Sequence, residues 1–185
     1  MGHRVCPPWV GYWLTCPARR WWQNPNDIVA PYIHEGQVVL EPGPGMGYFT
    51  LDLARMVGPS GRVIAVDIQP KMLERVRKRA GKAGVGSRIE ARLARAESMG
   101  IRELRRIVDF TLAFAVVHEF PDQARFFREV AEVSKPGAAL LLAEPRGHVK
   151  EPMFASELED AGRAGFKVTD RPKISGSHAA VLKIK

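Results

Sequence analysis

Cysteine is scarce in this chain, and long hydrophobic runs are missing. The two cysteines, Cys6 and Cys16, both lie near the start, and we expect them to be reduced rather than bridged. With His3 they supply only scattered metal ligands without the close spacing of a zinc site, so we expect no bound metal. No apolar run reaches membrane-spanning length and the N-terminus lacks the features of a signal peptide. We therefore predict a cytoplasmic location and no membrane partner.

Acidic residues are fewer than basic ones, and the formal net charge is +8. Residues 71–106 contain 12 Lys and Arg but only 4 Asp and Glu, so this stretch carries the whole excess. Such a basic face can attract anionic substrates or RNA from a distance. No aromatic residue that could stack on a base lies among these basic residues. A solvated helix face is the simpler interpretation, and RNA binding is the alternative.

The first 36 residues differ in composition from the rest of the 185-residue chain, whose length suits one domain. All four tryptophans lie here among prolines that argue against a long helix. Exposed indole rings are costly, so we expect residues 1–36 to form an N-terminal arm that packs on the domain formed by residues 37–185. The arm is either a lid or a structural cover. As a lid it would offer four substrate contacts: Tyr12, Trp13, Arg19 and Arg20.

The most informative stretch runs from Val38 to Asp67. An apolar run is followed by Glu41 and by glycines at three alternate positions, 43, 45 and 47; a second apolar run ends at Asp67. We predict a strand, a glycine loop, a helix, a turn and a second strand. A glycine-rich turn between a buried strand and a helix lets a ligand approach the backbone and the free helix N–H groups. This loop is therefore a binding site.

The spacing of the loop excludes two common nucleotide sites. The dinucleotide pattern G-x-G-x-x-G would need glycine at position 48, where Tyr48 stands, and the Walker pattern G-x-x-x-x-G-K-[ST] is absent. Glu41 at the mouth of the loop would repel a pyrophosphate. It suits a cation or a ligand rich in hydroxyl groups.

The pattern Glu41-x-Gly43-x-Gly45-x-Gly47, with an acid closing the next strand, resembles motif I of the Rossmann-like, S-adenosylmethionine-dependent methyltransferases. The resemblance implies an α/β fold: a doubly wound, mostly parallel seven-stranded sheet with an antiparallel last strand. In that family the loop lies against the methionine and ribose, and the acid accepts hydrogen bonds from the ribose hydroxyls. The resemblance implies S-adenosyl-L-methionine as cofactor, bound by Glu41, Gly43, Pro44, Gly45, Gly47, Asp67, Ile68, Ala96, Glu97 and Phe114.

The segment that would contact adenine departs from the family pattern. Family members often carry Gly-Asp-Ala after the third strand, and this chain has Arg95-Ala96-Glu97. Either Glu97 or a backbone carbonyl would then accept the hydrogen bond from the adenine amino group. Both alternatives remain open.

The fourth predicted strand, residues 108–115, leads into Val116-Val117-His118-Glu119. In open α/β sheets ligands lie beyond the carboxyl ends of the strands. The segment lacks the [DN]-P-P-[YFW] motif of enzymes that methylate amino groups of adenine or glutamine, and the cysteine nucleophile of pyrimidine C5 enzymes. It resembles the type-11 methyltransferases, which act on quinone precursors and other small molecules and often carry a histidine near this point.

His118 is the candidate catalytic base because imidazole titrates near neutral pH. Alternatively it fastens the loop to a carbonyl. Glu119 either orients His118 or simply precedes the next helix. Arg146 and His148 follow the predicted fifth strand at 138–144 and, with Glu119, are candidate acceptor contacts.

The sequence thus predicts methyl transfer to a small-molecule acceptor. The alternatives are an RNA methyltransferase that uses residues 71–106 and a non-catalytic protein that binds S-adenosylmethionine or RNA. Both a monomer and a homodimer are compatible with the sequence.

The remaining elements follow from periodicity and end signals. A helix capped by Asn26 or Asp27 should lead into the first strand, Pro70 should open a second helix, and Asp122 should cap a third. We expect the third strand at 87–91, a last helix at 151–164, and a final hairpin from strands at 166–171 and 178–185.

Overall fold

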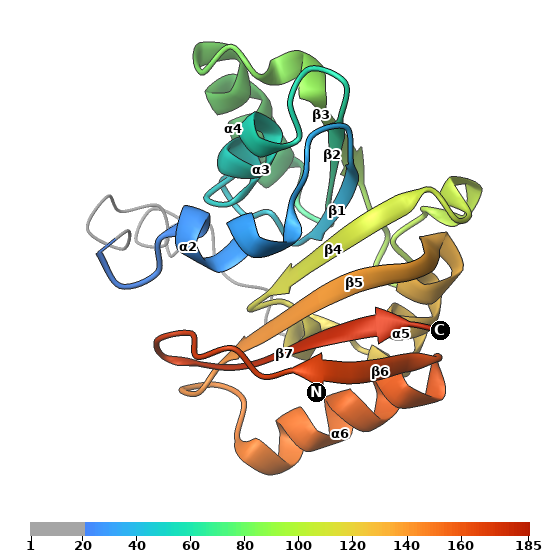
Figure 1. The fold of residues 1–185 in the computed structure, drawn as a ribbon. Helices are drawn as coiled ribbons and strands as arrows, with labels where there is room; N and C mark the ends of the chain where they lie inside the picture. Colours follow the sequence, from blue (N-terminus) through green and yellow to red (C-terminus); the bar gives the residue numbers. More distant parts are fainter. Residues whose placement is uncertain (1–20) are drawn as a thin grey trace.

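The computed structural model describes residues 21–185. They form a seven-stranded sheet in the order β3-β2-β1-β4-β5-β7-β6 (Figure 1). β7 is antiparallel to both β5 and β6, and the remaining pairs are parallel. The predicted fold class is confirmed. Tyr12, Trp13, Arg19 and Arg20, from which substrate contacts are expected, lie outside the described residues, as do His3, Cys6 and Cys16.

The strands match their predicted positions closely, with two differences. β3 begins two residues later than expected, and β5 begins at Ser134 rather than Ala138. Ser134 pairs with Val108 ahead of a register shift, and Gly137 takes a positive φ of 78° there, so Lys-Pro-Gly is part of an irregular strand rather than a turn. The strands are β1 (Val38–Pro42), β2 (Arg62–Asp67), β3 (Ile89–Leu93), β4 (Val108–Phe114), β5 (Ser134–Pro145), β6 (Phe166–Asp170) and β7 (Ser177–Ile184).

The helices also begin and end near the expected residues. The Asp122 side chain caps α5 by accepting from the Arg125 N–H at 2.8 Å, as predicted. The predicted cap of α2 was wrong: Asn24 caps it, because Pro25 already occupies the first turn. Among the described helices none is long and apolar enough to cross a membrane. The α-helices are α2 (Pro25–Val29), α3 (Thr50–Met56), α4 (Pro70–Lys82), α5 (Gln123–Val133) and α6 (Glu151–Arg163).

Helices cover both faces of the sheet, and a hydrophobic core lies on each. Val39 and Leu40 are successive residues of β1 whose side chains enter opposite cores. The core that holds Leu40 contains side chains of α5 and α6, and the core that holds Val39 contains side chains of α2, α3 and α4. Since both faces are buried, the central strands are continuously apolar. Polar residues appear where the parallel strands end, at one edge of the sheet.

Three arginines of the basic stretch 71–106 bond to neighbouring parts of the fold. Arg77 donates to the Ala91 carbonyl at 2.8 Å, and Arg88 donates to the Ala54 carbonyl at 3.2 Å. Arg92 forms ion pairs with Glu90 and Glu103. These arginines connect α4, β3 and α3, whereas most of the other basic residues of the stretch, such as Lys71 and Lys78, are exposed.

Candidate cofactor and acceptor site

The glycine loop leaves β1 in a tight turn. Gly43, Gly45 and Gly47 have φ values of +64°, +54° and +81°, a region that other residues rarely adopt. The Gly43 N–H donates to the Val66 carbonyl of β2 at 2.8 Å, and the Gly47 N–H donates to the Pro44 carbonyl at 2.9 Å. The alternate glycines of the sequence are therefore a backbone requirement.

Two of these glycines have different surroundings. A Cβ atom on Gly43 would lie 2.4 Å from Cγ2 of Val116, in the loop that follows β4. A Cβ atom on Gly45 would meet nothing within 4 Å. Gly43 thus allows two loops to pack together, whereas Gly45 faces open space in front of the loop.

We predict that Gly43→Ala lowers the free energy of unfolding by about 2–4 kcal/mol, from backbone strain and overpacking together. Gly45→Ala should cost only about 1–2 kcal/mol, from the strained φ alone. Urea unfolding measures both values. In a Val116→Ala background the cost of Gly43→Ala should shrink while that of Gly45→Ala stays the same. Equal costs for the two glycines in both backgrounds would contradict this assignment.

Two buried acids flank the loop. Glu41 is 3% exposed, and burial, with a smaller contribution from the charge of Asp67, raises its pKa to about 8. Its Oε2 has no hydrogen-bond partner among the described residues. Burial also raises the pKa of Asp67, to about 6, although the N–H groups of Gln69, Gly45 and Ile68 oppose the rise. At neutral pH the site therefore offers an ionised acceptor at Asp67 and a protonated acid at Glu41.

The end of β3 borders Asp67. The Ala94 N–H donates to the Asp67 carbonyl at 2.9 Å. Ile68 follows β2 and Leu93 ends β3, and both are exposed apolar side chains, at 41% and 59% exposure. Leu93 was not predicted as a site residue, although an exposed leucine at a strand end is a usable signal.

Of the remaining predicted cofactor residues, Ala96 and Glu97 are exposed to solvent, whereas Phe114 packs against another aromatic side chain. A tight turn, closed by reciprocal backbone hydrogen bonds of 3.0 and 3.2 Å between Arg95 and Ser98, carries the exposed Ala96 and Glu97 at its tip. Phe114 is half-buried and packs on Phe49, with ring centroids 4.6 Å apart.

His118 is held by a residue that the sequence did not single out. It lies in a 3-10 turn, Val117–Glu119, and its Nδ1 is hydrogen-bonded to Oε2 of Glu144 at the end of β5. Glu144 is fully buried, and its Oε1 accepts from the N–H groups of Val116 and Val117 at 3.2 and 2.7 Å. Glu144 makes the hydrogen bond that orients His118, a role that the sequence offered to Glu119 as one of two alternatives.

The surroundings of His118 favour its protonated form. Burial lowers its pKa, but the hydrogen bond to Glu144 and the charges of Glu144 and Glu119 outweigh burial and raise the pKa overall. The side chain stays 19% exposed, and the ring of His148 lies 5.8 Å away between centroids. A histidine that gains a proton readily and still reaches the surface can act as a base.

A further buried acid, Glu157 of α6, lies close enough to Glu144 and His118 to interact with them electrostatically. Its Oε1 accepts from Gln123 Nε2 at 3.3 Å, and its Oε2 has no partner among the described residues. Burial, helped by the charge of Glu144, raises the pKa of Glu157 to about 8. Glu157 is therefore mostly protonated at neutral pH.

We predict that Glu157→Gln makes stability less sensitive to pH. An acid with a pKa of 4.5 unfolded and about 8 folded keeps its proton longer in the folded state, so stability falls as pH rises between these values. The variant lacks this loss and should be more stable than wild type by about 1–2 kcal/mol at pH 8.5 but not at pH 4.5. Urea unfolding at both pH values measures the difference. Glu159→Gln, at an exposed position of the same helix, is the control, and an unchanged pH slope in Glu157→Gln would refute the prediction.

Comparisons with known proteins agree with this geometry. Residues 33–171 match the family model described as a methyltransferase domain. The ubiquinone/menaquinone biosynthesis C-methyltransferase UbiE of Enterobacter sp. (strain 638) is 31% identical over 121 residues, which cover 65% of this chain and 47% of that protein. The protein-L-isoaspartate O-methyltransferase of Korarchaeum cryptofilum (strain OPF8) is 32% identical over 131 residues, 63% of this chain and 58% of that protein. The chain thus spans about half the length of the curated relatives it matches.

Solved structures share the fold. A SAM dependent methyltransferase from Aquifex aeolicus superimposes with a TM-score of 0.83 at 26% identity, covering 97% of this chain and 98% of that one. Aeropyrum pernix fibrillarin, crystallised with natively bound S-adenosyl-L-methionine, superimposes with a TM-score of 0.65 at 19% identity over 83% of this chain and 68% of that one. At that identity the likeness to fibrillarin concerns the fold alone.

The residues around the glycine loop fit S-adenosylmethionine. The cofactor combines a sulfonium cation with a ribose diol. The loop offers open space in front of Gly45, a hydrogen-bond acceptor at Asp67, and at Glu41 a buried carboxyl oxygen without a partner among the described residues. By this site, its fold and the match over residues 33–171, the chain belongs to the Rossmann-like, S-adenosylmethionine-dependent methyltransferases.

Proposed function

We propose that this protein transfers a methyl group from S-adenosylmethionine to a small-molecule acceptor at the carboxyl ends of β4 and β5. The observation that carries the proposal is the His118–Glu144 pair. It places a partly exposed imidazole, oriented by a buried carboxylate, at the same sheet edge as the glycine loop and Asp67. A protein that only bound the cofactor would have no need of an oriented base.

The cofactor would be held by the predicted residues. Asp67 would accept hydrogen bonds from the ribose hydroxyls, Gly43, Pro44, Gly45 and Gly47 would shape the loop, and Glu41 would offer a buried carboxyl group at the mouth of the loop. Ile68 offers an apolar surface to the adenine, with Leu93 as an addition to the predicted set. Either Glu97 or a backbone carbonyl of its turn accepts from the adenine amino group. When bound, the cofactor would supply an activated methyl group, because the sulfonium leaves as the neutral thioether S-adenosylhomocysteine.

The protein's own contribution is orientation and proton removal. Because Glu144 accepts at Nδ1, the proton of neutral His118 is on that nitrogen and Nε2 carries the lone pair. The acceptor atom loses its proton to Nε2 as it gains the methyl group, and His118 returns the proton to water. The N–H groups of Val116 and Val117 donate to Glu144 and so hold the His118–Glu144 pair beside the end of β4.

The similar proteins leave the acceptor atom open, because one is named a C-methyltransferase and another an O-methyltransferase. A small-molecule acceptor is supported by the first of these names. RNA methylation through residues 71–106 is the second candidate. It rests on the exposed cations of α4, such as Lys71 and Lys78.

The test combines binding and transfer. Calorimetry with S-adenosylhomocysteine should show one site per chain. Radiolabelled S-adenosylmethionine should then label a fraction of a small-molecule extract and leave total RNA unlabelled. Label in RNA with a steep salt dependence would favour the second candidate, and a folded protein that gives no heat with S-adenosylhomocysteine would overturn the proposal.

A further inference from the structure

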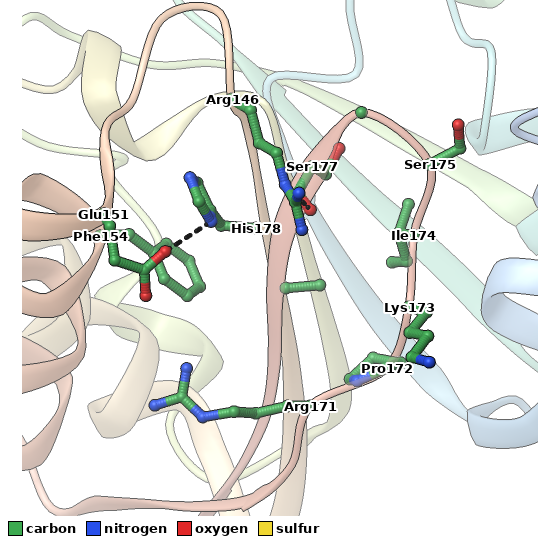
Figure 2. Close-up of a pocket in the computed structure, with 12 residues that line it drawn as sticks. Arg146, Glu151, Phe154, Arg171, Pro172, Lys173, Ile174, Ser175, Ser177 and His178 are labelled. Carbon is green, nitrogen blue, oxygen red and sulfur yellow. Dashed lines mark hydrogen bonds and ion pairs between the residues drawn. The ribbon is translucent and has the colours of Figure 1, made fainter.

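A cavity of about 630 Å³ opens beside the candidate acceptor site (Figure 2). Its walls are the loop at 171–176, the start of β7, Arg146 and the first turn of α6. The predicted acceptor contact Arg146 thus belongs to a cavity that the sequence did not indicate. We refer to it as the hairpin cavity.

The charges around the hairpin cavity are mainly positive. Arg146, Arg171 and Lys173 line it, and the one acid in its lining, Glu151, is bonded to Nδ1 of His178 at 2.9 Å. No hydrogen bond or ion pair engages the guanidinium of Arg171 or the ammonium of Lys173 within residues 21–185. Within residues 21–185, three cationic side chains therefore line a cavity whose only carboxylate already has a partner.

The cavity is built on anchored backbone. The Ser177 N–H donates to the Ile174 carbonyl at 3.1 Å, and the Arg146 N–H donates to the Gly176 carbonyl at 3.0 Å. Nε of Arg146 also donates to the Ser177 carbonyl at 3.1 Å, which directs the guanidinium over the middle of the cavity, as Figure 2 shows. A guanidinium fixed in this way loses little freedom when it binds a carboxylate or phosphate in its fork.

The cavity also adjoins the pair that would carry the chemistry. His178, in its wall, is the cross-strand partner of Glu144, which orients His118. Arg146 follows Glu144 by two residues, a separation of at most about 7 Å along the chain. If one group of a ligand occupied the hairpin cavity, the rest of that ligand would therefore lie close to His118.

We infer that the hairpin cavity binds an anionic group, a carboxylate or a phosphate, of the methyl acceptor. The assignment to the acceptor rests on the proposed function, whereas the binding of an anion does not. The acceptor is then an acid, anchored by Arg146, Arg171 and Lys173 with its reacting atom toward His118.

The test uses inorganic phosphate and benzoate as probes, each titrated into the full chain and followed by NMR. Either probe should shift the signals of the Arg146 Nε–H and of the loop at 171–176. The tighter probe tells whether the group is a phosphate or a carboxylate. The double variant Arg171→Ala/Lys173→Ala should bind it at least ten-fold more weakly. The control Arg105→Ala/Lys167→Ala removes two exposed cations elsewhere and should bind it like wild type.

Two outcomes overturn the inference. One is an anion affinity that is the same in both double variants, or shifts that avoid the cavity. The other is a labelled methylation product that carries no acidic group, as judged by its passage through an anion exchanger. Calorimetry with S-adenosylhomocysteine separates these from failure of the proposed function, since both double variants should bind that molecule as wild type does.

Discussion

Asp67→Ala should weaken the binding of S-adenosylhomocysteine by about 100-fold or more. In the proposed function the carboxylate accepts from two ribose hydroxyls. A hydrogen bond to a charged group contributes about 1.5–3 kcal/mol, so losing two would cost about 3–6 kcal/mol. Calorimetry measures the change. Asp67→Asn keeps one oxygen and the hydrogen bond from the Gln69 N–H and should lose only about ten-fold.

The pH dependence of binding tests the same residue. Because the pKa of Asp67 is about 6, wild-type affinity should fall as pH drops through that value and the carboxylate gains a proton. Asp67→Asn should lack this fall. Asp109→Asn, at the opposite end of the sheet, where Asp109 pairs with Lys135, should keep wild-type affinity and pH dependence. Near-normal affinity in Asp67→Ala would remove the ribose assignment.

His118→Ala should lower kcat by about 100- to 1000-fold, the usual contribution of a general base. Its affinity for S-adenosylhomocysteine should stay within about two-fold of wild type, because His118 is not among the residues assigned to the cofactor. Single-turnover kinetics with labelled cofactor measures the rate. Full turnover in this variant would mean that His118 only fastens the loop.

Glu144→Gln tests the orienting residue separately. The amide oxygen can still accept from Val116 and Val117, but the negative charge that raises the pKa of His118 is lost. We expect kcat to fall about ten-fold. The pH at which the rate rises should also become lower, because the pKa of His118 falls. Glu119→Gln is the comparison, since Glu119 acts on His118 only as a secondary charge. If Glu119→Gln matched Glu144→Gln in both measures, Glu144 would lose its assigned role.

Local signals in the sequence located most elements. Asp122 capped α5 as predicted, and Pro70 opened α4, because caps and first-turn prolines act through neighbouring backbone groups. The cap of α2 was misplaced because three nearby polar residues, Asn24, Asn26 and Asp27, all have side chains that can cap a helix. The start of β5 was misplaced because its first pairing, Ser134 with Val108, is a long-range contact.

The sequence by itself determined the cofactor loop: three glycines at positive φ between two acids are a local requirement, readable without knowing the rest of the chain. Only the tertiary structure brought Glu144 to His118, 26 residues away in sequence, and placed Arg171 and Lys173 around one cavity with Arg146. The physical reason is the sheet. Parallel strands end at a common edge, so residues from distant segments meet there, and the pairing that aligns them has no local signature in the sequence.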